Sequence, residues 1–267
     1  MSERRGTTRP KKLLIEERRR DIVDRARQEG RVTVDDLVDR YGVSAVTIRG
    51  DLENLELAGL LKRSHGGAVP QDASQQDTPL PIKETRRLAE KRRIGEAAAR
   101  MIGDGETVIL DSGSTTVEIA RCIRQRKWGS LTVITNALNI ALELSGLPTV
   151  RVMMLGGMLR QTSYSLVGLD AERALSRLSA DRLFLGVDGL DTTVGVTTPD
   201  PQEASLNAMM VKASREVVAV CDASKLGQRS LAVIAPIGDL NVVITDTSAG
   251  KAHVASLREQ GVEVVLV

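Results

Sequence analysis

Aromatic side chains are scarce in this chain of 267 residues, which contains one Trp, two Tyr and one Phe. Proteins that bind RNA or single-stranded DNA stack bases on aromatic rings, so both classes are disfavoured. Cysteine and histidine are also rare, at two residues each, and no Cys-x-x-Cys pair occurs. We therefore expect no metal site, no cofactor and no disulfide framework, and buried thiols in a reduced compartment are the simpler interpretation.

Long hydrophobic runs are missing as well. No stretch reaches the ~18 apolar residues of a membrane span, and the basic start of the chain lacks the apolar core of a signal peptide. We therefore expect a cytoplasmic protein with no membrane partner. Hydrophobic residues make up 42% of the chain, which is enough for buried cores, and the length suits one small and one medium domain.

Positive charge is concentrated at the start of the chain. The formal net charge of the whole chain is only +2, so no global field marks a nucleic-acid binder. Residues 1–20 nevertheless hold eight Lys or Arg against three Glu. We expect residues 1–12 to be a disordered basic tail, and the basic residues within 1–20 to add salt-dependent attraction to a polyanion.

Residues 13–70 have the pattern of a winged helix-turn-helix domain. Three helical patterns follow one another, and Gly42 breaks the chain between the second and the third. Thr33 precedes the second helix, and Ser44 is a good N-cap for the third. The helix-turn-helix itself is placed at about 32–51. The apolar members of the third helix are Val46, Ile48, Leu52 and Leu55.

The segment "LLKRSHGGAV" predicts two short strands around a turn that contains Gly66 and Gly67. In this architecture the N-terminal end of the third helix meets base edges in the major groove, and the wing contacts the backbone or the minor groove. An alternative is a small helical domain whose basic residues are only solvated. The candidate DNA-binding residues are Ser44, Ala45, Thr47 and Arg49 on the helix and Lys62, Arg63 and His65 on the wing.

The segment "VSAVTIRGDL" resembles the recognition-helix motif of the DeoR family of bacterial transcription regulators, and "RSHGGA" is similar to that family's wing. The resemblance implies double-stranded operator DNA as a partner. Gly50 departs from the family, which usually carries a polar or basic side chain there. A mid-helix Gly costs ~1 kcal/mol relative to Ala and offers no side-chain contact, so the base reading assigned to this position in relatives is not expected here.

Residues 71–91 begin Pro-, Gln- and Asp-rich and predict a linker and the start of a connecting helix, which occupies about 83–101. From 92 to 267, short apolar runs alternate with helical patterns, which indicates a parallel sheet covered on both faces. The predicted fold class is therefore α/β, with a winged helix-turn-helix joined to a domain with a mostly parallel sheet. The predicted strands are "TVIL", "LTVIT", "VRVMML", "RLFLGV", "VVAVC", "NVVIT" and "VEVVLV".

The segment "TVILDSGSTTVEIA" predicts a strand, a loop of small residues and the start of a helix. Hydroxyls and backbone N–H groups at a helix N-terminus favour anions, above all phosphate. The loop is neither a Walker A loop nor GxGxxG, and a Ser/Thr-rich cap is the alternative. Polar residues follow other strands too, and the carboxyl ends of parallel strands form ligand sites together. The candidate effector-binding residues are Ser112, Gly113, Ser114, Thr115, Thr116, Asn136, Gly156, Gly157, Asp188, Gly189, Glu203, Asp222, Ser224 and Lys225.

Residues 92–267 resemble the effector domain of the DeoR family, which is similar in fold to ribose 5-phosphate isomerase. "DSGSTT", "DGLD" and "DASK" resemble the isomerase's phosphate loop, its Asp-Gly-Ala-Asp segment and its Asp-Ser-Ser-Lys segment. The isomerase's catalytic Glu would fall near Asn207, and an amide cannot act as the base. Its Lys-Gly-Gly segment has no counterpart, and Glu203, one helical turn from Asn207, is the one alternative base. The resemblance implies a pocket without catalytic residues, in which Lys225, Asp188 and Glu203 hold sugar hydroxyls or an amino group.

The preferred hypothesis is a DNA-binding repressor of a carbohydrate operon that is released by a phosphorylated sugar. Within this family, "VILDSGSTTVEIAR", "FLGVDGLD" and "SLNAMM" followed by "DASK" most resemble the N-acetylgalactosamine-operon repressors. This finer resemblance implies an amino-sugar or tagatose-type phosphate as the effector. We expect a homo-oligomer, either a dimer or a tetramer, because paired heads on repeated half-sites multiply a weak affinity. The alternatives are a sugar-phosphate isomerase-like enzyme with a DNA-binding appendage and a nucleoid scaffold. The operator, the effector, the oligomer size and the sign of control stay open.

Overall fold

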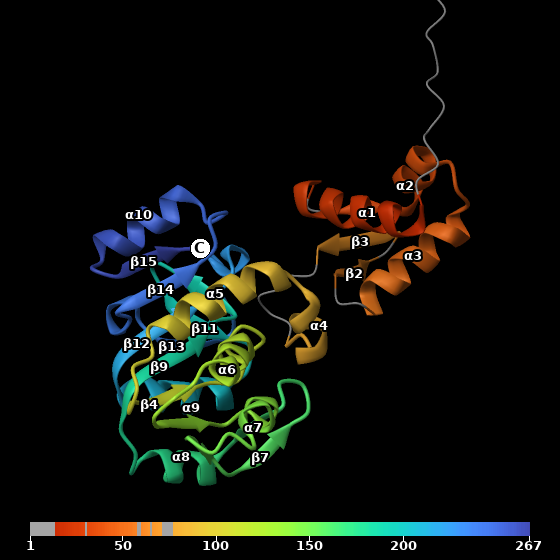
Figure 1. Ribbon diagram of the computed structural model, residues 1–267. Coiled ribbons are helices and arrows are strands. Elements are labelled where there is room, and N and C mark those ends of the chain that lie inside the picture. Colours follow the sequence, from red (N-terminus) through yellow and green to blue (C-terminus); the bar gives the residue numbers. More distant parts are fainter. Residues whose placement is uncertain (1–13, 30, 58–59, 65, 71–76) are drawn as a thin grey trace, which may run out of the picture. The chain divides into compact units, whose positions relative to one another are not determined.

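The computed structural model describes residues 14–29, 31–57, 60–64, 66–70 and 77–267 (Figure 1). Contacts divide the chain into two compact units, Met1–Gln76 and Asp77–Val267. The basic tail and His65 lie outside the described residues, so the expectations for them stay predictions. Within the described ranges, every helix is too short or too polar to cross a membrane.

The described part of the first unit is a winged helix-turn-helix. Its elements are α1 (Ile15–Glu29), β1 (Val32–Thr33), α2 (Val34–Tyr41), α3 (Ala45–Leu57), β2 (Leu61–Ser64) and β3 (Gly67–Pro70). The Thr33 hydroxyl accepts a hydrogen bond from the Asp36 backbone N–H (3.2 Å) and caps α2. Gly42, with a φ of 62°, ends α2 in the left-handed conformation that glycine favours. Both residues confirm the predicted limits of this helix.

The wing consists of antiparallel β2 and β3, and β3 also pairs with β1. Gly66, with a φ of 77°, lies in the turn as predicted. Gly67 does not lie in the turn, because it is the first residue of β3. A Cβ atom at Gly67 would lie 2.0 Å from the Val32 carbonyl oxygen. A glycine is therefore required there because β1 passes too close for any side chain.

The second unit is built on a seven-stranded parallel sheet with the order β15-β14-β12-β9-β4-β5-β6. Its strands are β4 (Thr107–Leu110), β5 (Leu131–Thr135), β6 (Val150–Met154), β9 (Ala180–Gly186), β12 (Ser214–Val220), β14 (Val242–Thr245) and β15 (Glu263–Leu266). Each corresponds to one of the seven predicted apolar runs, which confirms the α/β prediction. Continuous apolar runs give parallel strands because both faces of such a sheet are buried.

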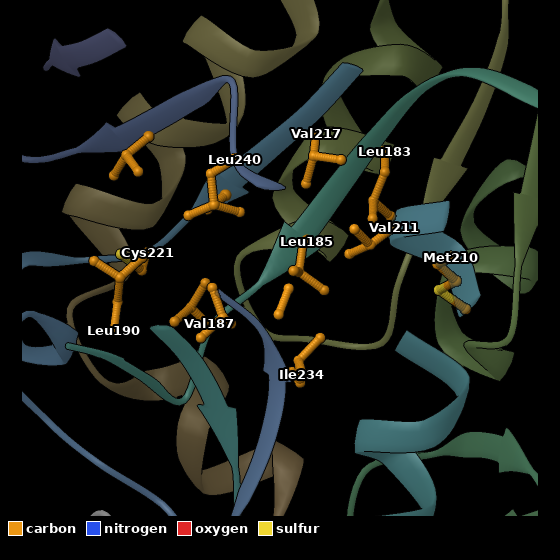
Figure 2. Packing of buried hydrophobic residues seen from close by; sticks show 14 of the residues in the cluster. Leu183, Leu185, Val187, Leu190, Met210, Val211, Val217, Cys221, Ile234 and Leu240 are labelled. Carbon is orange, nitrogen blue, oxygen red and sulfur yellow. The ribbon is translucent and has the colours of Figure 1, made fainter. Parts of the chain in front are cut away.

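Helices cover both faces of this sheet (Figure 1). They are α5 (Leu88–Arg100), α6 (Thr116–Gln125) and α7 (Leu138–Leu144) on one face, and α8 (Leu169–Leu175), α9 (Pro201–Lys212) and α10 (Lys251–Glu259) on the other. Successive side chains of β9 alternate between the two layers. Phe184 packs with the first set of helices, whereas Leu183 and Leu185 pack with the second. Figure 2 shows Leu183 and Leu185 together with Met210 and Val211 of α9.

The connecting helix predicted at about 83–101 is wrong in one respect, because it is two helices, α4 (Leu80–Thr85) and α5. Arg87 separates them with a φ of 49°, a left-handed conformation that is unusual for a residue other than glycine. The buried Lys91 ammonium donates to the backbone carbonyls of Lys83 (2.5 Å) and Arg86 (2.8 Å). This side chain satisfies carbonyl groups that a continuous helix would have bonded internally.

Short antiparallel strands that the sequence did not predict extend the second unit. They are β7 (Met158–Arg160) paired with β8 (Ser165–Val167), and β10 (Gly189–Asp191) paired with β11 (Gly195–Thr198), which also pairs with β13 (Ala232–Ala235). Segment 77–91 belongs to this unit, since the Leu80 N–H donates to the Thr162 carbonyl (2.7 Å) and the Leu80 side chain is buried.

Candidate functional sites

The N-terminal turn of α3 carries four of the predicted DNA-binding residues. The Ser44 hydroxyl accepts a hydrogen bond from the Thr47 backbone N–H (3.2 Å) and lies 2.9 Å from the Thr47 hydroxyl. Ser44 therefore caps the helix, as predicted. Ser44, Thr47 and Arg49 are exposed, and Ala45 is half-buried. A partner can reach this end of the helix.

The side of α3 that faces its own domain is held to α1 by a buried carboxylate. Asp51 accepts hydrogen bonds from the guanidinium groups of Arg18 (2.7 Å) and Arg19 (2.9 Å) on α1. Because Asp51 and Arg18 are both buried, these bonds fix the angle between α1 and α3. Two arginines at the start of the chain thus have a structural partner in the domain.

Lys62 and Arg63 are exposed on β2 of the wing, where a DNA backbone contact was predicted. The Arg63 backbone N–H donates to the Glu56 carboxylate (2.9 Å), which ties the wing to the C-terminal half of α3. The cationic side chains stay exposed, and the predicted contact at His65 lies outside the described residues.

The five strands that precede the predicted effector loops are neighbours, in the order β12-β9-β4-β5-β6. Because the sheet is parallel, their carboxyl ends and the loops that follow share one edge. The loop 112–116 leads into α6, and within the described chain its backbone N–H groups at 112–115 have no acceptor. The Thr116 hydroxyl donates to the backbone carbonyls of Asp111 (3.0 Å) and Gly113 (3.1 Å) and so closes the loop. Backbone N–H groups without an acceptor at a helix N-terminus are the kind of feature that favours an anion.

Asp188 lies between two lysines at this edge. Its carboxylate is 2.7 Å from the Lys83 ammonium and 3.9 Å from the Lys225 ammonium. Burial alone would raise the pKa of Asp188, but the charges of Lys83 and Lys225 outweigh it and hold this pKa below its usual range. Asp188 and Lys225 therefore lie together, as predicted. Lys83, from α4, was not predicted, because nothing in the linear sequence connects α4 with the end of β9.

Glu203, in the first turn of α9, is buried in a polar network. Its carboxylate accepts a hydrogen bond from the Ser165 hydroxyl (2.9 Å) and pairs with the Arg160 guanidinium (2.6 Å). Arg160 also pairs with Asp77 and, at 3.3 Å, with Asp200. Because Arg160 bridges Asp77 and the carboxylates of α9, this network holds the start of segment 77–91 against that helix.

Asp222 and Ser224 form a local turn after β12. The Asp222 carboxylate accepts hydrogen bonds from the Ser224 backbone N–H (3.0 Å) and hydroxyl (2.5 Å), which caps the short helix 223–225. The Arg87 guanidinium lies 3.5 Å from the same carboxylate. Asp222 is buried, so both its cap and its ion pair restrict how a ligand could use it.

The four glycines among the predicted effector-binding residues differ in how closely the protein packs around them. A Cβ at Gly157 would lie 2.4 Å from the Val167 carbonyl, and one at Gly189 would lie 2.6 Å from the Thr197 hydroxyl. These two glycines are required by packing against neighbouring strands. Gly156 has no atom within 4 Å of such a Cβ, and at Gly113 the Thr116 hydroxyl would lie at 3.1 Å. Of these four glycines, only Gly156 has open space where a side chain would be, so protein packing does not require that glycine.

Two buried amides in this unit have unused acceptor atoms. Asn136 follows β5 and donates to the Leu166 carbonyl (3.2 Å), while its own side-chain oxygen has no partner. Asn207, on α9, is 6% exposed, and its side-chain oxygen also has no partner. At Asn207 the chain carries an amide rather than a carboxylate, and the nearest alternative base, Glu203, is engaged by Arg160.

The sequence analysis also missed Asp111, directly after β4. It is fully buried, and neither carboxylate oxygen has a hydrogen-bond partner. Burial, together with the charges of Glu203 and Asp188, raises its pKa well above the usual range. Such a group marks functional sites because its burial is costly for folding. The signal in the sequence was an acidic residue at the end of the apolar run "TVIL".

A hollow of about 690 Å³ lies elsewhere, between α5 and α6. None of the predicted effector residues lines it, so its size alone does not make it the effector site. Its lining residues are Arg92, Glu96, Ala99, Arg100, Glu118, Arg121, Cys122, Gln125 and Arg126.

Two family models match the chain. The DeoR-like helix-turn-helix domain matches residues 18–73, and the DeoR C terminal sensor domain matches residues 86–247. The chain is 40% identical to the "Putative aga operon transcriptional repressor" of Escherichia coli O157:H7, over 94% of this chain and 93% of that protein. It is 38% identical to the HTH-type transcriptional regulator GlpR of Haloferax volcanii, over 95% and 98% of the two chains.

Among solved structures, ribose 5-phosphate isomerase A of Methanocaldococcus jannaschii is similar to part of the chain, with 16% identity, a TM-score of 0.38, and coverage of 51% of this chain and 53% of that one. This likeness is too weak to bear on function. The family models, in contrast, cover the winged helix-turn-helix and the α/β unit, and the relatives match nearly their full length. The chain belongs to the DeoR family of transcription regulators, with its DNA-binding helix-turn-helix domain followed by its sensor domain.

Proposed function

We propose that this chain represses a carbohydrate-utilisation operon and is released from its operator by a phosphorylated sugar bound at the carboxyl edge of the sheet. The observation that carries the proposal is the loop 112–116, whose N–H groups at 112–115 have no acceptor in the described chain. A phosphate oxygen is the ligand that such a loop at a helix N-terminus binds best. The buried acceptors Asp111, Asn136 and Asn207 suit the hydroxyl or amino groups of a sugar.

An amino-sugar phosphate is the effector class that we favour. Its support is the resemblance to N-acetylgalactosamine-operon repressors and the relative named for the aga operon. The candidate pocket also has several carboxyl groups, at Asp111, Asp188, Glu203 and Asp222. An amino group placed among them would gain charge-assisted hydrogen bonds.

Binding without turnover is the second part of the proposal. An aldose–ketose conversion needs a carboxylate that is free to take a proton from carbon. The position expected to hold it carries Asn207, and Glu203 is engaged by Arg160 and Ser165. We therefore favour a sensor over an isomerase-like enzyme. Incubation with ribose 5-phosphate and galactosamine 6-phosphate, followed by NMR, should show no product.

Coupling between the sensor and the DNA-binding domain would run through segment 77–91, which directly follows the first unit. Three ion pairs tie this segment to the candidate pocket. They are Asp77 with Arg160, Lys83 with Asp188, and Arg87 with Asp222. A sugar that bonds to Asp188, Asp222 or Glu203 would compete with these pairs and change how the segment is held. Such a two-state element is what an effector needs in order to alter DNA affinity.

The test is a band-shift titration of the DNA upstream of the protein's own gene. Galactosamine 6-phosphate, N-acetylgalactosamine 6-phosphate, tagatose 6-phosphate and glucose 6-phosphate are compared with the unphosphorylated sugars. At least one phosphorylated sugar should release the DNA, and its unphosphorylated form should not. Release by none of them, or equally by both forms, would contradict the proposal.

A matched pair of variants tests the phosphate loop. Ser114→Asp places a negative charge in the loop, and Ser145→Asp places the same charge at an exposed site after α7. Ser114→Asp should bind DNA but lose its response to sugar phosphate, whereas Ser145→Asp should respond as the wild type does. We also expect a homo-oligomer on the operator, which sedimentation of the complex would measure.

A further inference from the structure

The face of α3 that points away from its domain is unusual in composition. Ile48, Leu52 and Leu55 are buried and define the core face. With 3.6 residues per turn, Val46 and Gly50 lie one turn apart on the opposite face. The Val46 side chain is 75% exposed, and a Cβ at Gly50 would have no atom within 4 Å. Val46, grouped from the sequence with the apolar members of this helix, is thus outside the core.

Neither residue stabilises the free domain. Valine loses rotamer freedom in a helix, and glycine is among the poorest helix formers. A buried valine or a tightly packed glycine would compensate for this, but Val46 is largely exposed and Gly50 has open space where a side chain would be. The presence of Val46 and Gly50 on this face is therefore best accounted for by a binding partner that contacts it.

The surroundings identify the partner as the major groove of duplex DNA. The helix belongs to a DNA-binding helix-turn-helix, in which the N-terminal part of this helix enters that groove. The Ser44 and Thr47 hydroxyls and the exposed Arg49 guanidinium flank Val46, and in the described chain Arg49 forms no ion pair. Polar groups at the sides can hold phosphates or base edges, while the outermost surface at Val46 is made only of methyl groups.

The major groove offers one prominent apolar group to such a surface, the 5-methyl group of thymine. We propose that Val46 reads a thymine methyl group in the operator, and that the missing side chain at Gly50 leaves the space for this contact. An Arg or Gln at position 50 would fill the groove one helical turn further along. This inference rests on the DNA-binding domain alone, so it is independent of whether a sugar phosphate releases the DNA.

The experiment begins with duplexes selected from a random library by the full-length wild-type protein. Each thymine of the best duplex is then replaced, one at a time, by deoxyuridine, which lacks only the methyl group. At one position per half-site, the wild type should lose about fourfold in affinity, as expected for one buried methyl group. Val46→Ala should bind the thymine and deoxyuridine duplexes of that position equally well.

Two further variants make the test specific. Leu57→Ala removes another exposed side chain, 81% accessible, from the far end of the same helix face, and should keep the fourfold preference for thymine. Gly50→Ala adds a methyl group where the free domain has space, and should reduce the preference without unfolding the protein. Circular dichroism and melting of each variant confirm the fold.

Three results would overturn the proposal. In the first, no thymine shows a methyl effect with the wild type. In the second, Val46→Ala weakens binding to the thymine and deoxyuridine duplexes by the same factor, which would place Val46 on the DNA backbone. In the third, no duplex is enriched by the selection at all.

Discussion

At the scale of the residue, Asp111 is the group with the clearest consequence for stability. Its pKa is raised because the carboxyl is fully buried and lies near the negative charges of Glu203 and Asp188. The folded state therefore holds this proton more tightly than the unfolded chain, whose Asp has a pKa of about 3.9. Stability contributed by this group falls as pH rises from about 4 towards the raised value, because the unfolded state loses the proton first.

Asp111→Asn removes the ionisable group with little change of shape. We expect the variant to melt higher than the wild type at pH 8, by on the order of 5 °C, and the difference to shrink towards zero near pH 4. Thermal melts of both proteins between pH 4 and pH 8 measure it. A constant difference across this range would show that Asp111 carries no penalty from ionisation.

The sequence identified the loops of the candidate site better than the charged side chains that pair with residues of these loops. Hydroxyls and glycines in "DSGSTT" were recognisable because a strand, a small-residue loop and a helix start follow one another. Asp111, in the same motif, was missed because its burial depends on how β4 sits between β9 and β5. The partners Lys83 and Arg160 were missed because they come from segments that no local pattern connects with the strand ends.

At the scale of the element, two glycines inside helices make a matched comparison. A Cβ at Gly95 in α5 would lie 2.8 Å from the Glu118 Cβ in α6, whereas one at Gly50 in α3 would meet nothing. Gly95→Ala should destabilise its unit by about 1–3 kcal/mol because α5 and α6 must separate. Gly50→Ala should stabilise its unit by up to about 1 kcal/mol through helix propensity.

Urea unfolding of the two variants checks these opposite signs. If Gly95→Ala were as stable as the wild type, the close approach of α5 to α6 would be wrong. If Gly50→Ala were destabilised, the outward face of α3 would have a contact within the protein after all.

The regular elements followed from local patterns, and the irregular ones did not. All seven strands of the parallel sheet were predicted, because a strand buried on both faces is continuously apolar. The strands β7, β8, β10 and β11 lack that signature, because each includes a polar residue. The strand β13, "AVIA", is continuously apolar but was not predicted. The break at Arg87 could not be predicted either, because it depends on Lys91 reaching back to two carbonyl groups.

At the scale of the whole molecule, a DNA-binding unit precedes a sensor unit, and segment 77–91 is the first part of the sensor unit. The family and the order of the two domains could be predicted from sequence, because both units carry recognisable motifs. From the sequence, the linker and the helix at 83–101 were expected to couple them. The ion partners of segment 77–91 could not be predicted, because its charges acquire them only in the folded second unit. Asp77 is the first residue of the sensor unit, and its pair with Arg160 connects it to Glu203.

Asp77→Asn should therefore weaken the coupling more than either binding event. If a sugar phosphate lowers the affinity for DNA by some factor, DNA must lower the affinity for the sugar phosphate by the same factor. Couplings of this kind usually amount to about 5–150-fold. We expect Asp77→Asn to reduce this factor severalfold in both directions, while the affinity for DNA alone and for sugar phosphate alone stays within about threefold of the wild type.

The control for this experiment is Arg215→Gln, which removes an exposed ion pair with Asp181 (3.3 Å) away from the segment. Exposed ion pairs contribute little to stability, and this pair does not involve segment 77–91. This variant should therefore keep the full coupling factor. Fluorescence anisotropy of labelled DNA, with and without saturating sugar phosphate, gives the factor in one direction. Calorimetry of sugar phosphate binding, with and without DNA, gives it in the other. An unchanged factor in Asp77→Asn would mean that the sensor acts on the DNA-binding domain by another route than the start of this segment.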